Sequence, residues 1–60
     1  MSKLELARRT AELSQKQLAS KCHCSQQMIA CLENGTKQPS LALAQRIAKA
    51  LNKKVEELFE

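Results

Sequence analysis

The sequence predicts an all-α fold, a compact bundle of five short helices that forms one domain over residues 1–60. Nine Leu and eight Ala dominate the apolar residues, and both residue types favour helices. Strands favour β-branched and aromatic residues, but the chain has one Val, two Ile and one Phe, with no Trp and no Tyr. A single Gly and a single Pro leave little turn chemistry for hairpins. An all-β fold is therefore nearly excluded.

The first helix is predicted near residues 2–11. Leu4, Ala7 and Ala11 recur there at helical spacing and would share one apolar face.

The second helix has the best-marked start in the chain. Ser14 and Gln17 have the spacing of a capping box, in which each side chain accepts the other residue's backbone N–H. Leu13 and Leu18 flank this cap at the positions of a hydrophobic staple. The helix is predicted to run from the cap to about Cys22.

The third helix repeats this pattern. Ser25 is the predicted N-cap, and Cys24 can pack against Ile29 as the staple. The helix is predicted over about 26–33, because the Asn-Gly pair that follows can take positive φ and end it.

The fourth helix follows a short loop and begins at Ser40, which is again the N-cap. Its apolar stripe consists of Ala44, Ile47, Ala48 and Leu51. Asn52 is the predicted C-terminal cap. A fifth and shorter helical turn contains Val55, Leu58 and Phe59.

The charge distribution indicates a polyanionic partner. Residues 1–54 carry ten positive and three negative charges, and residues 55–60 carry three Glu. A basic body with an acidic end suits a polyanion, although a basic surface kept for solubility would have the same composition. The chain has one His, no Asp and no Gly-rich loop. We therefore expect no enzymatic activity, no cofactor and no small-molecule substrate.

The three cysteines and the absence of a long apolar stretch predict a cytoplasmic protein with reduced thiols and no membrane partner. The cluster Cys22-His23-Cys24, with Cys31, raises a zinc or thiol-switch hypothesis. Its spacing matches no usual zinc pattern. Cys22 and Cys24 fall at positions that the fold would bury, whereas Cys31 faces outward. We predict no metal site, and oxidation of Cys31 stays as an alternative role.

The second and third helices carry the functional signal. The link between them, His23-Cys24-Ser25, is too short for antiparallel packing and fits a helix-turn-helix over about 14–34. Ala19 is small where the helices would cross. The shared core is predicted to contain Leu18, Cys22, Ile29 and Leu32.

Seven motifs and one single position extend this pattern over nearly the whole chain. They are Leu13-Ser14-Gln15, Leu18-Ala19, Ser25-Gln26-Gln27, Ile29, Leu32-Glu33-Asn34-Gly35, Pro39-Ser40-Leu41, Ile47-Ala48-Lys49-Ala50-Leu51 and Glu57-Leu58-Phe59. With these residues the sequence resembles the Cro/CI-type (XRE-like) helix-turn-helix domains of phage repressors and small bacterial regulators. The resemblance implies a lambda-repressor-like fold and sequence-specific binding to double-stranded DNA by a nucleoid-associated transcriptional repressor or regulator. Phage repressors, restriction–modification controllers, antitoxins and chromosomal regulators all fit it.

The third helix is the expected reader of DNA sequence. With Ile29 facing the core, the residues that point outward are Gln27, Ala30, Cys31 and Asn34, and Gln26 flanks them. A helix of eight residues is about 12 Å long and fits a major groove about 12 Å wide. The resemblance implies that Gln26, Gln27 and Cys31 read base edges and that Ala30 contacts a thymine methyl group.

Phosphate contacts are expected on both sides of that groove. The start of the second helix offers free N–H groups and a partial positive charge, and Gln15 and Lys16 are its nearest side chains. The resemblance adds Asn34, Thr36 and Lys37 on the other side.

The resemblance also implies an ion pair between Arg8 and Glu33 that ties the third helix to the first; two unrelated surface charges are the alternative. It marks two departures as well. His23 and Glu12 stand where the family commonly has Gly in a left-handed conformation, at a cost of about 1 kcal/mol each.

One such domain reads only a few base pairs, so we expect a homodimer, at least on DNA. It would bind a pseudo-palindromic operator with half-sites about 34 Å apart. Val55, Leu58 and Phe59 are possible dimer contacts, although Leu58 and Phe59 are equally candidates for the core. The alternative function is a helical protein–protein interaction module, antitoxin-like or an adaptor, with weak or no DNA binding.

Overall fold

The computed structural model describes residues 1–60 and contains five helices and no strand. The helices are α1 (Lys3–Thr10), α2 (Gln15–Cys22), α3 (Gln26–Asn34), α4 (Leu41–Leu51) and α5 (Val55–Phe59). The predicted all-α class and five-helix architecture are confirmed. The first helix is one residue shorter at each end than predicted, and α3 extends one residue further. None of the helices has the length and apolarity that a membrane span requires.

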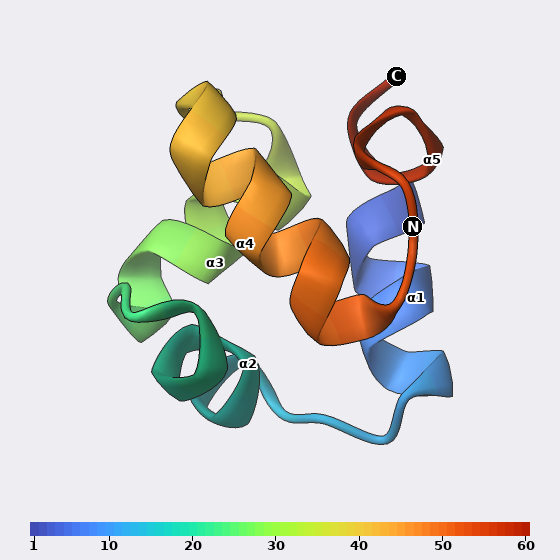
Figure 1. Cartoon of the computed structure of the whole chain (residues 1–60). Coiled ribbons are helices and arrows are strands. Elements are labelled where there is room, and N and C mark those ends of the chain that lie inside the picture. Colours follow the sequence, from blue (N-terminus) through green and yellow to red (C-terminus); the bar gives the residue numbers. More distant parts are fainter.

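The helix-turn-helix unit lies on one side of the bundle (Figure 1). The helix α4 crosses the middle of the molecule, with α2 and α3 on one side of it and α1 and α5 on the other. In terms of contacts, α2 packs against α3 and α4, α5 packs against α1 and α4, and α1 also touches α3. The helix α3 is therefore held by both α1 and α2.

The core lies where the helices meet. It contains Leu4, Leu18, Ala19, Cys22, Ile29, Leu32, Leu43, Ile47, Ala48, Leu51 and Leu58. The predicted shared core of α2 and α3 is confirmed, since all four of its residues are buried. Ala19 is also buried, so a larger side chain there would push the helices apart. Ala11 was wrongly placed on the buried face: α1 ends before it, and it is exposed.

Serine hydroxyls cap the first four helices. The capping serines are Ser2, Ser14, Ser25 and Ser40, and each accepts the backbone N–H three residues on. The predicted capping box is confirmed, with Gln17 N donating to Ser14 Oγ at 3.0 Å and Ser14 N donating to Gln17 Oε1 at 2.8 Å. At the start of α3, Ser25 satisfies the backbone N–H of Met28. These caps fix where each of the four helices begins, including α3 of the helix-turn-helix unit.

Three residues other than Gly have left-handed backbone conformations. They are Glu12 (φ 60°), His23 (φ 58°) and Asn52 (φ 56°). The left-handed positions predicted for Glu12 and His23, and the cap predicted at Asn52, are therefore confirmed. His23 caps α2, and its N–H donates to the carbonyl groups of Ala19 and Ser20. The Cβ of His23 makes this conformation costly, because it approaches the following carbonyl oxygen.

The substitution His23→Gly is expected to stabilise the domain by about 0.5–1 kcal/mol and to raise its melting temperature by roughly 2–8 °C. Glycine adopts the left-handed conformation without the Cβ clash, and its greater entropy in the unfolded chain offsets part of the gain. Thermal unfolding followed by circular dichroism measures the change. His23→Ala is the matched control, since it keeps the Cβ and should bring no gain. A lower melting temperature for His23→Gly would contradict the turn described here.

Candidate nucleic-acid interface

The outward face of α3 is polar at its start and its end. Ile29 and Leu32 point into the core, which turns Gln26, Gln27 and Asn34 into solvent, where all three are exposed. The amide groups of glutamine offer both a donor and an acceptor, as the edge of adenine requires. This face can therefore present hydrogen-bonding groups to a partner without moving a core residue.

The residues in the middle of the same face are less exposed than the sequence indicated. Ala30 and Cys31 are half-buried rather than fully outward. A shallow hollow beside Ala30 is lined by Glu5, Gln15, Ala30, Glu33 and Asn34. Between the two glutamines and Asn34, the side chains on this face are therefore small and partly apolar.

A buried ion pair anchors α3 to α1. Arg8 Nε lies 2.6 Å from Glu33 Oε2, and Arg8 Nη2 donates to Glu33 Oε1 at 3.3 Å. The two side chains are only 9% and 5% exposed. Arg8 Nη1 also donates to the carbonyl oxygen of Leu13 at 2.8 Å. The hydrogen bond to Glu33 raises the pKa of Arg8, so the guanidinium stays charged in spite of its burial.

Gln15 joins this network, which the sequence did not predict. Its Nε2 donates to Glu33 Oε1 at 3.0 Å. Glu33 therefore connects three helices, with Arg8 on α1, Gln15 on α2 and its own place on α3. One N–H of the Gln15 amide is still free to reach a phosphate, and the hydrogen bond to Glu33 holds the amide in position.

The other candidate phosphate ligands are exposed. Lys16 lies in the first turn of α2, and Thr36 and Lys37 follow α3. Asn34 Oδ1 accepts from Thr36 N at 3.0 Å and from Thr36 Oγ1 at 2.7 Å. These bonds occupy the oxygen of the Asn34 amide and direct its NH₂ group outward. Gly35, at φ 83°, makes the turn into this loop.

Arg46 has a contact that was not predicted. The sequence places it outside the apolar stripe of α4, and its side chain is exposed. Its Nε nevertheless donates to the carbonyl oxygen of Cys22 at 3.0 Å. This bond ties the C-terminal end of α2 to α4 and satisfies one of the carbonyl groups that a helix end leaves free.

All three thiols are free. Cys22 is buried, and Cys24 and Cys31 are half-buried. Burial raises the pKa of both Cys22 and Cys24, so these thiols are protonated and unreactive at neutral pH. Nowhere does the structure bring three His, Cys, Asp or Glu side chains close enough to share an ion.

The stability of the domain is expected to fall as the pH rises above 9.0, the ordinary pKa of these thiols. The unfolded chain ionises them there while the folded chain keeps Cys22 and Cys24 protonated, so unfolding releases protons and becomes more favourable. The contribution of the two thiols is fully present below pH 9.0 and is lost above it. Denaturant unfolding between pH 8 and 10, with reductant, measures the slope. The variant Cys22→Val/Cys24→Ala should lose stability less steeply, and equal slopes would contradict the prediction.

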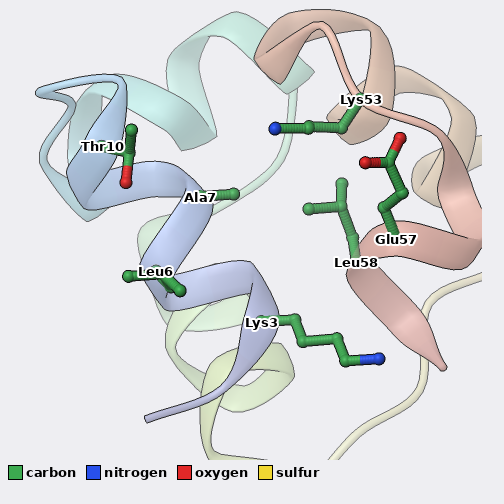
Figure 2. Close-up of a pocket in the computed structure, with 7 residues that line it drawn as sticks. All are labelled: Lys3, Leu6, Ala7, Thr10, Lys53, Glu57 and Leu58. Carbon is green, nitrogen blue, oxygen red and sulfur yellow. The ribbon is translucent and has the colours of Figure 1, made fainter.

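The C-terminal helix has less free surface than the sequence allowed. Leu58 belongs to the core. Figure 2 shows its side chain in a hollow between α1 and α5, which is lined by Lys3, Leu6, Ala7, Thr10, Lys53, Glu57 and Leu58. Val55 and Phe59 are half-buried and keep part of their surface exposed. Of the three candidate dimer contacts, only Val55 and Phe59 retain appreciable area for a partner.

Comparison with known proteins agrees with this architecture. A family model described as "Helix-turn-helix" matches residues 2–58. An uncharacterized HTH-type transcriptional regulator of Methanocaldococcus jannaschii is 41% identical over 58 residues, which cover 97% of this chain and 88% of that protein. A second such regulator, from Methanothermobacter thermautotrophicus, is 42% identical over 53 residues, which cover 87% of this chain and 77% of that protein. A third, from Archaeoglobus fulgidus, is 40% identical over 47 residues, which cover 78% of this chain and 67% of that protein.

Proposed function

Because the chain belongs to the helix-turn-helix family, we propose that it is a transcriptional regulator that binds a specific sequence of double-stranded DNA through α3. The observation that carries this proposal is the outward face of α3, where Gln26 and Gln27 are exposed on a helix fixed by its serine cap and by Glu33. A helix held in this way can enter the major groove as a rigid body. The relatives' names, which describe HTH-type transcriptional regulators, support the same conclusion.

In this proposal Gln26 and Gln27 read base edges by hydrogen bonds. Each well-formed bidentate pair with adenine contributes about 1–3 kcal/mol of discrimination. Ala30 and Cys31 offer small half-buried surfaces that fit the methyl group of thymine. The preferred half-site therefore contains A·T pairs opposite the start and the middle of α3.

Phosphate contacts flank the reading face. Gln15 and Lys16 approach one strand from the start of α2, and the amide of Gln15 is already oriented by Glu33. Asn34, Thr36 and Lys37 approach the other strand from the loop after α3. These contacts place α3 in the groove and carry no sequence information of their own.

We propose that the operator is bound by a homodimer that represses transcription by occupying it. The exposed parts of Val55 and Phe59 supply the apolar contact between the two copies. A two-fold dimer places its recognition helices about 34 Å apart, so the site is a pseudo-palindrome with half-sites about one helical turn apart.

Selection of bound sequences from random duplex DNA tests this function. We expect one A·T-containing half-site, repeated in inverted orientation at a spacing of about 10 base pairs. Enrichment of a single unrepeated half-site would contradict the dimer, and enrichment of no sequence would contradict sequence-specific binding.

Affinity for the selected operator is expected to fall steeply with salt, with a slope of about −0.9 in log K against log salt for each phosphate contacted by a cation. Lys16→Gln should make this slope shallower by about 0.9, because one phosphate contact is removed. Lys53→Gln is the matched control, since Lys53 lines the hollow between α1 and α5. Binding that does not depend on salt would favour a protein-interaction module instead.

A further inference from the structure

A second group of cations lies in a hollow between α2 and α4. Lys21 and His23 come from the C-terminal end of α2, and Arg46 and Lys49 come from α4. With Ala50 they line a hollow of about 460 Å³ that has no acidic side chain in its wall.

This hollow is separate from the surface proposed to bind DNA. Lys21 follows Gln15 by six residues on α2, which places the two side chains about 120° apart around the helix axis. Gln15 contacts Glu33 of α3, whereas Lys21 shares the hollow with residues of α4. The two basic surfaces therefore lie on different sides of α2.

The positive charge in the hollow is greater than the partial negative charge of the helix ends beside it. Neither Lys21, Arg46 nor Lys49 forms an ion pair, since the two ion pairs of the chain involve Arg8 and Arg9. The C-terminal ends of α2 and α4 each carry about half a negative charge, which together balance about one cation. The hollow has three side-chain cations, with His23 counted as neutral. After the two helix ends have balanced one of them, an excess of about two positive charges is left. A doubly charged anion would balance it.

Two features prepare the hollow for an oxyanion. The bond from Arg46 Nε to the Cys22 carbonyl holds the guanidinium in place and leaves both of its Nη groups free to donate. His23 occupies a left-handed position that glycine would fill without strain. Residues kept in such conformations are concentrated at functional sites, and the side chain of His23 lies in this hollow.

We infer that the hollow binds a compact phosphate dianion, the terminal phosphate of a small phosphorylated ligand. A phosphomonoester carries about 1.5 to 2 negative charges at neutral pH, which matches the excess charge. A phosphodiester of a nucleic-acid backbone carries only one. The site would make the regulator responsive to a phosphorylated metabolite, and it does not depend on DNA binding by α3.

Nuclear magnetic resonance titration with inorganic phosphate and with adenosine monophosphate tests the site, with sodium chloride adjusted to constant ionic strength. We expect saturable shifts at Lys21, His23, Arg46 and Lys49. Lys21→Gln and Lys49→Gln should each weaken binding by about two- to five-fold, the effect of one exposed charge. Lys16→Gln is the matched control on the DNA-facing side of α2 and should not change the affinity.

His23→Gly separates ligand binding from folding. It should weaken phosphate binding while raising the melting temperature, a combination that a purely structural role would not produce. The inference is overturned if phosphate gives no saturable shifts, if the double variant Lys21→Gln/Lys49→Gln binds phosphate as well as the parent chain, or if only a non-operator duplex shifts these residues. Phosphate binding should persist in Gln26→Ala/Gln27→Ala, so failure of the DNA proposal and failure of this inference are distinguishable.

Discussion

Replacing Arg8 by alanine is expected to destabilise the domain by about 3–5 kcal/mol, because the carboxylate of Glu33 would be left buried without its partner. Glu33 is only 5% exposed with Arg8 in place, and the neutral amide of Gln15 would be its remaining side-chain donor. A domain of this length has a total stability of roughly 3–9 kcal/mol, so the variant should lose a large part of it. Denaturant unfolding at 10–25 °C measures the difference.

Arg9→Ala is the matched control for this prediction. Arg9 is the next residue on α1 and also pairs with a glutamate, Glu5, at 2.9 Å. That pair is exposed, with 60% of the Arg9 side chain accessible, and pairs of this kind contribute only about 0.3–0.5 kcal/mol. Similar small losses in both variants would show that burial of the Arg8–Glu33 pair carries no energetic weight.

The double variant Arg8→Met/Glu33→Leu separates stability from function. Apolar residues of similar volume can replace a buried ion pair at little cost or with a gain, so this variant should fold. It removes the acceptor that orients Gln15. We therefore expect normal stability and weaker operator binding, and unchanged binding would show that Glu33 has no part in positioning Gln15.

Local signals in the sequence were sufficient to predict where the helices lie. The capping box at Ser14 and Gln17 involves neighbouring residues only, so its residue types and spacing define it. The cap at Asn52 follows the same logic, since it ends a helix whose last carbonyl groups need a partner. The left-handed turn at His23 was expected only from the family resemblance. Such features do not depend on how the helices pack.

The contacts between helices could not be predicted in the same way. Gln15 and Glu33 are 18 residues apart, and Arg46 and Cys22 are 24 apart, so both hydrogen bonds depend on the packing of α2 against its neighbours. Nothing near Arg46 in the sequence marks it as a partner for a carbonyl group. The burial of Leu58 likewise depends on α5 folding back on α1 and α4.

The double substitution Gln26→Ala/Gln27→Ala is expected to lower affinity for the selected operator by at least about 30-fold, since two base-reading amides contribute about 1–3 kcal/mol each. Stability should not fall, because both side chains are exposed and alanine is the better helix former. Fluorescence anisotropy with labelled operator measures the affinity, and thermal unfolding serves as the check on folding.

Affinity for a non-operator duplex decides how that loss is interpreted. The phosphate ligands on α2 and after α3 are unchanged in the double variant, so non-specific binding and its salt slope should be retained. The affinity for the operator should therefore fall toward the affinity for the non-operator duplex, and the latter should stay constant. An equal fall in both affinities would mean that the glutamines contact the backbone, and unchanged operator binding would mean that α3 does not read the sequence.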